Sequence, residues 1–247
     1  AVGFYPCSEW NLSNADLLLV TVKAWQVSGA LEPLLSKLHP DLIVLAMHNG
    51  MGTFDYLVDN LSNSPLLFAT TSHGALKMND SDVKHTGWGE TKLGALNQKG
   101  LSCQFLTDVL NHALAPVEWQ ENIHHALLLK LAVNCAINPL TALNNIKNGQ
   151  LSTDSYSPLL EKLIDEICCV INAEGLTITR EALTTVVNKV IISTADNYSS
   201  MHQDIAHQRR TEIDFITGYL LERAKCHNIS VPINDSLFQK IKKIEDK

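Results

Sequence analysis

Short apolar runs and helical patterns alternate through the first half of the chain. Three mainly apolar runs rich in leucine and β-branched residues lie at 16–22, 41–47 and 66–72, and helical patterns separate them. Continuous apolar strands joined by helices are typical of parallel strands that are covered on both faces. We therefore expect this half to form part of a doubly wound parallel sheet.

Two further segments complete the first half. The glycine-rich stretch VKHTGWGETKLGAL, residues 83–96, alternates polar and apolar positions and predicts a hairpin. Helical spacing returns in LSCQFLTDVLNHAL, residues 101–114.

After about residue 121 the strand signals end and helical patterns remain. Helices separated by turn and breaker residues are predicted at 122–138, 157–174, 179–198, 211–227 and 234–244. We therefore divide the chain into a sheet domain, residues 1–121, and an all-helical domain, residues 122–247.

Two polar residues follow strands of the predicted sheet. Lys23 comes after the first apolar run and Asn49 after the second. Ligands of open parallel sheets collect beyond the carboxyl ends of the strands, so we expect both side chains to project into one crevice. The ordinary alternatives are a solvated loop lysine and a plain Asn-Gly turn.

A row of polar residues crosses the most apolar predicted helix. In KLAVNCAINPLTALN, residues 130–144, Lys130, Asn134 and Asn138 are spaced by four, so they lie on nearly the same helical face. The other positions are mainly apolar, which predicts a largely buried helix. Buried polar groups need partners, so either a ligand or a hydrated crevice between helices has to satisfy this row.

The segment 197–224 holds further polar candidates. Asn197 and Ser200 are three residues apart and could share a helical face, and Glu212 opens an apolar helical pattern after Thr211, a possible cap. A carboxylate early in a helix also has an ordinary explanation, because it favours the positive end of the helix dipole.

Composition excludes several classes of protein. With 247 residues, 45% of them hydrophobic, the chain should be globular, and 19 basic against 26 acidic residues argue against a nucleic-acid partner. We find no apolar run of the roughly 20 residues that span a bilayer and no signal peptide, so we expect no membrane partner. Six cysteines without a Cys-x-x-Cys pair fit a reducing cytoplasm.

Known short motifs for metal, phosphoryl and hydrolytic chemistry find no support. His202, Asp204 and His207 are the nearest approach to a metal cluster, but neither His-Glu-x-x-His nor a Cys/His zinc pattern is present. There is also no Walker loop and no Gly-x-Ser-x-Gly elbow. We therefore predict no metal site.

The combined pattern resembles ketopantoate reductase, a family of the 6-phosphogluconate dehydrogenase-like reductases. The resemblance runs over nearly all of the chain from Asp16 onward, and its specific signals are the Lys-x-x-x-Asn-x-x-x-Asn row and the Ser-Ser-Met-x-Gln-Asp segment with the following Thr-Glu-Ile-Asp. It is carried by DLLLVTVKAWQVS, LAMHNGMGT, LLLKLAVNCAINPLTALNN, NGQL and DNYSSMHQDIAHQRRTEIDFITGYLLERAKCHNISVP.

The resemblance implies a fold, an activity and a cofactor. The fold would be a Rossmann-like domain followed by a helical domain of the 6-phosphogluconate dehydrogenase C-terminal type. The activity would be the NADPH-dependent reduction of 2-dehydropantoate (ketopantoate) to (R)-pantoate, in the pathway to pantothenate and coenzyme A. Monomers and homodimers both fit this architecture.

The resemblance also implies roles for individual residues. Lys130 matches the catalytic lysine that protonates the ketone oxygen, and Glu212 matches the glutamate that holds the substrate hydroxyl. Substrate-binding positions are matched by Asn134, Asn138 and Ser200, and more weakly by Asn197 and Asn148. Cofactor-facing positions are matched by Lys23, Gln26 and Asn49.

The chain departs from the family pattern at its beginning. The family opens with a strand, a Gly-x-Gly-x-x-Gly loop and a helix, and this sequence contains none of them, so the Rossmann-like sheet is expected to be incomplete. Two classes of function stay open: a reductase of ketopantoate or a related 2-keto acid, and a truncated non-enzymatic remnant that keeps the fold. Pocket shape, which one sequence cannot give, decides the substrate.

Overall fold

The computed structural model describes residues 10–79 and 81–246. The chain divides into two compact units, Ala1–Ala126 and Leu127–Lys247, and each unit is described by itself. The division falls inside helix α4 (Ile123–Asn144), whereas the pattern of the sequence placed the boundary just before this helix.

The first unit is built on a five-stranded mixed sheet with the order β1-β2-β3-β6-β7. The pairs β1–β2, β2–β3 and β6–β7 are parallel, and β3–β6 is antiparallel. The first three strands coincide with the three apolar runs, and β2 and β3 are almost fully buried, as continuous apolar runs predict. The strands are β1 (Leu17–Val20), β2 (Ile43–Ala46), β3 (Leu66–Thr71), β6 (Thr91–Ala95) and β7 (Val117–Trp119).

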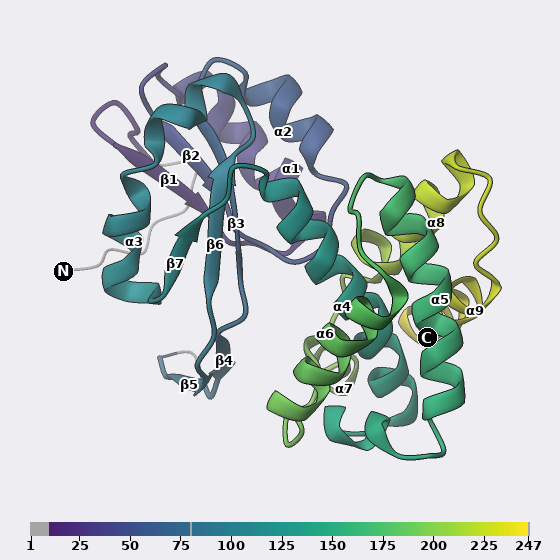
Figure 1. The fold of residues 1–247 in the computed structure, drawn as a ribbon. Helices are drawn as coiled ribbons and strands as arrows, with labels where there is room; N and C mark the ends of the chain where they lie inside the picture. The colour runs from purple at the N-terminus through teal and green to yellow at the C-terminus, as the bar shows by residue number, and fades with distance from the viewer. Residues whose placement is uncertain (1–9, 80, 247) are drawn as a thin grey trace. The chain divides into compact units, whose positions relative to one another are not determined.

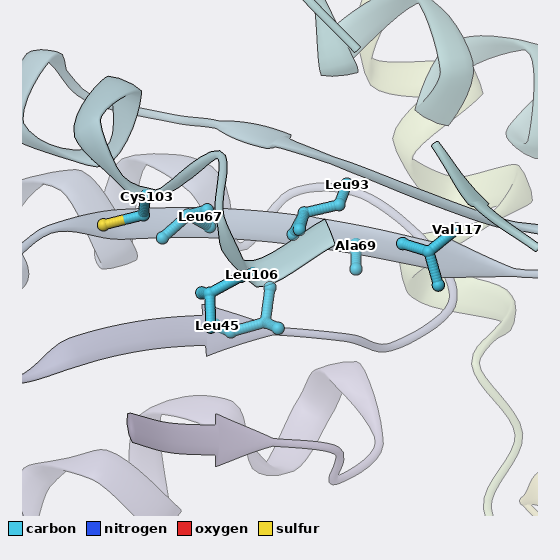
Figure 2. Packing of buried hydrophobic residues seen from close by; sticks show 7 residues of the cluster. All are labelled: Leu45, Leu67, Ala69, Leu93, Cys103, Leu106 and Val117. Atoms are coloured by element: carbon cyan, nitrogen blue, oxygen red, sulfur yellow. The ribbon is translucent and has the colours of Figure 1, made fainter. Parts of the chain in front are cut away.

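Helices cover both faces of this sheet. On one face Phe54 of α2 packs edge-on against Phe68 of β3, with ring centroids 5.2 Å apart. On the other face η4 and α3 contribute Cys103 and Leu106 to a buried cluster with Leu45, Leu67, Ala69, Leu93 and Val117 (Figure 2). The helical segments are η2 (Ala24–Gln26), α1 (Val27–Leu31), η3 (Glu32–Lys37), α2 (Phe54–Leu61), η4 (Gln98–Cys103) and α3 (Leu106–Leu114).

The hairpin predicted at 83–96 is wrong. Its first part, β5 (Val83–Gly87), pairs with β4 (Gly74–Lys77) in a separate two-stranded sheet, and its second part, β6, joins the main sheet against β3 (Figure 1). The burial of the two strands explains the difference, because β5 is mainly exposed and β6 is mainly buried. Strand β7 was also missed, since three residues carry too short a pattern to be recognised.

The described residues of the second unit form helices joined by loops, with no strand among them, as predicted. Helices α5 and α9 closely match their predicted ranges, but α6 ends at Ser193, several residues before the predicted end. Helix α7 and the 3-10 turn η5 were not predicted. The elements are η5 (Asn148–Ser152), α5 (Ser157–Ala173), α6 (Arg180–Ser193), α7 (Ser200–Ala206), η6 (Ile213–Phe215), α8 (Thr217–Cys226) and α9 (Pro232–Glu245), and Figure 1 labels the α-helices.

Helix α4 continues past Pro139, where the sequence predicted its end, to Asn144. A proline inside a helix removes one backbone hydrogen bond, but the neighbouring positions of α4 are buried on all sides, and this packing outweighs the local cost.

By length and composition α4 is apolar enough to cross a membrane, which corrects the expectation that no segment qualifies. However, 72% of its most apolar window is buried within the protein, as in the core helix of a globular domain. Its apolar character is therefore explained by packing.

Candidate active site

The polar row of α4 lies inside one continuous helix, as predicted. Lys130 and Asn134 are partly exposed, and Asn138, at 7% exposure, is buried. Eight residues of α-helix span about 12 Å, so the row presents one ammonium and two amides along a line of that length. It lies entirely in the second unit.

Lys130 and Glu212 interact electrostatically within this unit. Burial lowers the pKa of the Lys130 ammonium to about 8, and the negative charge of Glu212 opposes that change. Glu212 itself is only 3% exposed. A lysine whose pKa lies near neutrality can both stabilise a developing negative charge and donate a proton, which is the chemistry required of a general acid.

The structure corrects the predicted setting of Glu212. Glu212 does not open a regular helix: it precedes the three-residue turn η6, and α8 begins only at Thr217. Thr211 is not the cap, because the N-cap of η6 is Glu212; its Oγ1 instead closes a local turn by accepting a hydrogen bond from the backbone N–H of Ile213 at 3.1 Å. The dipole of a regular helix therefore does not explain the carboxylate at position 212, and the structure shows instead that Glu212 interacts with the charge of Lys130.

A second set of contacts joins the far end of α4 to the start of α7. Thr141, one turn beyond Asn138, places its Oγ1 2.8 Å from Oγ of Ser199. Ser199 caps α7 by accepting a hydrogen bond from the backbone N–H of His202. The row is thus bracketed by Glu212 near Lys130 and by the first turn of α7 near Asn138.

His202 adds another link between the same two elements. Its Nε2 lies 2.7 Å from Oδ1 of Asn145, just beyond α4, and its ring stacks on Tyr198. Because Oδ1 can only accept, Nε2 carries the hydrogen, and burial lowers the pKa of His202, which favours this neutral form. Thr141, Asn145 and Ser199 were not selected from the sequence, and His202 was considered only for a metal site; the Ser-Ser pair was the available signal for a cap at Ser199.

The remaining substrate-binding candidates, Ser200 and the weaker Asn197 and Asn148, lie outside α4. Ser200 is the exposed first residue of α7, and Asn197 lies outside any helix, so the two do not share a helical face as expected. Asn148 is buried; its Nδ2 donates to Oγ1 of Thr194, and its backbone N–H donates to the carbonyl of Asn197. Asn148 therefore ties η5 to the end of α6.

The candidate cofactor residues lie at the carboxyl ends of β1 and β2 in the first unit. Lys23 precedes η2, and its backbone N–H donates to Oε1 of Gln26 at 3.1 Å. Asn49 lies in the loop after β2, in which Gly50 and Gly52 adopt φ values of 79° and 94°. Since β1 and β2 are parallel neighbours, the structure brings both loops to the same edge of the sheet.

Buried His48, which the sequence reasoning missed, holds the loop of Asn49. Its Nδ1 donates to the carbonyl of Asn49 at 2.9 Å, and its Nε2 lies 3.2 Å from Oγ1 of Thr53. The only signal in the sequence was its place directly after an apolar run.

Among residues 10–79 and 81–246, no group of three or more metal-ligating side chains could hold a metal ion. Of the histidines and carboxylates considered for a metal site, His202 instead contacts Asn145, and Asp204 forms an ion pair with Arg209.

Comparisons of the sequence with known proteins converge on one family. The family model described as ketopantoate reductase PanE/ApbA matches residues 5–98, and the model of its C-terminal part matches residues 122–245. The 2-dehydropantoate 2-reductase of Vibrio cholerae serotype O1 is 51% identical over 95% of this chain and 79% of its own length. The enzyme of the same name from Bacillus subtilis is 32% identical over 94% and 76%.

Solved structures agree with this result. A PanE/ApbA family ketopantoate reductase from Ralstonia eutropha JMP134 superimposes with a TM-score of 0.85 at 27% identity, over 97% of this chain and 78% of that one. D-mandelate dehydrogenase with NADH and anilino(oxo)acetate has the same fold, with a TM-score of 0.89 at 24% identity, over 97% and 79%. The fold expected from the sequence, a Rossmann-like sheet followed by a helical domain, is confirmed.

Proposed function

Since this chain belongs to the ketopantoate reductase family of enzymes, we propose that it reduces 2-dehydropantoate (ketopantoate) to (R)-pantoate with NADPH, a step toward pantothenate and coenzyme A. The observation that carries the proposal is the pairing of a lysine whose pKa is lowered to about 8 with the buried Glu212, on a helix that also presents two amides.

Lys130 is the general acid in this proposal. Hydride addition to the ketone turns its oxygen into an alkoxide, so a donor must stand beside that oxygen. The Lys130 ammonium stabilises the developing charge and then gives up a proton, which a desolvated ammonium releases more readily than a solvated one.

The other proposed residues fix the substrate. The Glu212 carboxylate accepts a hydrogen bond from the substrate hydroxyl, which orients the molecule along α4. Asn134 and Asn138 are neutral donors, so they can bind oxygen atoms without neutralising Lys130. Ser200, and more weakly Asn197 and Asn148, complete the proposed set.

The first unit provides the proposed cofactor-binding residues. Lys23, Gln26 and Asn49 fit a dinucleotide, because they follow adjacent parallel strands and the glycines after Asn49 allow close approach of the backbone. NADPH, when bound, supplies the hydride. In this proposal residues 1–121 take the cofactor and residues 122–247 take the substrate, and the protein acts in the cytoplasm as a monomer or homodimer without nucleic acid or membrane.

The test is NADPH oxidation by this chain on addition of ketopantoate. We expect turnover, and we expect Lys130→Ala to lower kcat by about 10²-fold or more because it removes the general acid. Lys162→Ala, which changes an exposed lysine on α5, is the matched control and should behave as the unchanged chain.

Three results would contradict parts of this proposal. Near-normal turnover by Lys130→Ala would remove Lys130 from the mechanism. No turnover by the unchanged chain, together with ketopantoate binding measured by calorimetry, would favour the remnant that keeps the fold. Faster turnover of another 2-keto acid, tested in parallel, would reassign the substrate.

A further inference from the structure

The segment that carries Glu212 is attached to the C-terminal helix α9. Glu245 accepts a hydrogen bond from the backbone N–H of Thr211, with its Oε1 2.7 Å from the nitrogen. Glu245 is near the end of α9 and its side chain is only 10% exposed. The residue directly before Glu212 is thus fixed by a carboxylate 34 positions later in the chain.

A second contact with α9 lies just beyond Glu212. Lys242 donates to Oδ2 of Asp214 at 3.1 Å and pairs with Oε2 of Glu245 at 3.3 Å. Arg210 also donates to Oδ2 of Asp214. The charges therefore alternate in a connected network around the segment, and the carboxylates beside it raise the pKa of Lys242 against the effect of burial.

Exposure changes abruptly where these contacts begin. Residues 206–210 are exposed, whereas Thr211, Glu212 and Ile213 are buried, at 1%, 3% and 0%. Isolated surface ion pairs contribute little, but a charged acceptor that binds a backbone N–H in a mostly buried place is stronger. Glu245 is therefore the contact best placed to hold the segment in its buried position.

We propose that Glu245, supported by Lys242, is a positioning residue that holds Glu212 beside Lys130, so that α9 sets the geometry of the substrate site without touching substrate. This inference rests on the proposed function for its kinetic consequence, but its structural part does not require turnover.

The structural part is tested by nuclear magnetic resonance titration of the lysine side chains, with the Lys130 signal assigned from the variant Lys130→Arg. In Glu245→Ala, Glu212 should move away from Lys130, so the pKa of Lys130 should fall, by about one pH unit. Glu245→Gln lacks the charge but keeps an oxygen that can accept from Thr211, and should leave the pKa of Lys130 close to that of the unchanged chain.

Three further variants make the result specific. Lys243→Ala changes an exposed neighbour on α9 and should have no effect. Glu166→Ala removes contacts at the opposite end of α9, and should lower stability without shifting the pKa of Lys130. Lys242→Met should shift it in the same direction as Glu245→Ala but less; it also provides the test if Glu245→Ala does not fold.

The kinetic part follows KM and kcat separately. Glu245→Ala should raise KM for ketopantoate about tenfold while kcat changes less than about threefold, and Glu245→Gln should restore most of the loss. A pKa shift without any turnover in the unchanged chain would support the positioning role and contradict the proposed function.

Two outcomes would overturn the inference. Equal pKa shifts in Glu245→Ala and Glu245→Gln would mean that the charge of Glu245 acts directly on Lys130. An unchanged pKa of Lys130 in folded Glu245→Ala and Lys242→Met would mean that α9 does not position Glu212.

Discussion

The ammonium of Lys130 determines how the reaction rate should depend on pH. Its pKa is lowered to about 8, and the protonated form is the one that can donate to the alkoxide. We therefore expect kcat/KM for ketopantoate reduction to be level below this pH and to fall as pH rises through it. A profile that stays level up to pH 10 would contradict the assignment of Lys130 as the acid.

Glu212 should move that profile. Its negative charge raises the pKa of Lys130, so Glu212→Gln should shift the falling limb to lower pH as well as raise KM. Steady-state kinetics across pH would measure both effects.

The polar row of α4 was predictable, because its spacing is local. The pairing of Lys130 with Glu212 was accessible only through the family resemblance, because it joins residues 82 positions apart through folding.

In the second unit, a helix end is capped by a side chain that is distant in the sequence. Glu166 of α5 accepts hydrogen bonds from the backbone N–H of Ile233, the backbone N–H of Asn234 and Nδ2 of Asn234, all within 3.0 Å. These contacts satisfy free N–H groups in the first turn of α9, where Pro232 supplies no N–H.

Removing this cap should destabilise the protein. We expect Glu166→Ala to lower the free energy of unfolding by about 2 kcal/mol, since it leaves two backbone donors of a partly buried helix end unpaired. Glu161→Ala on the same helix changes an exposed ion pair with Arg180 and should cost less than about 0.5 kcal/mol. Equal urea midpoints for the two variants would contradict the capping role.

Contacts between residues that are distant in the sequence also limit how well the bounds and pairing of helices and strands can be predicted. The apolar runs of β1 to β3 were recognisable because burial on both faces leaves a continuous pattern. The pairing of β6 with β3 was not recognisable, because the alternating pattern of β6 does not specify which strand it pairs with. The extension of α4 beyond Pro139 likewise reflects tertiary packing that outweighs a local rule.

At the scale of the whole molecule, the two units should divide the two substrates between them. Lys23→Ala and Asn49→Ala, in the first unit, should raise KM for NADPH and leave KM for ketopantoate nearly unchanged. Asn138→Ala, in the second unit, should do the reverse, because its amide lies in the polar row of α4. Varying both substrates in steady-state assays would measure each constant, and an effect of Asn138→Ala on NADPH alone would contradict this division.

The separate pairing of β4 with β5 has a consequence for handling the protein. The hairpin hydrogen-bonds within itself, and it exposes Leu76, Met78 and Val83 together with Lys77 and Lys84. An exposed two-stranded sheet with few buried apolar contacts opens more readily than the strands of a buried sheet. Trypsin should therefore nick the chain first at these lysines and leave both cores folded, which makes the hairpin the natural place to insert a label.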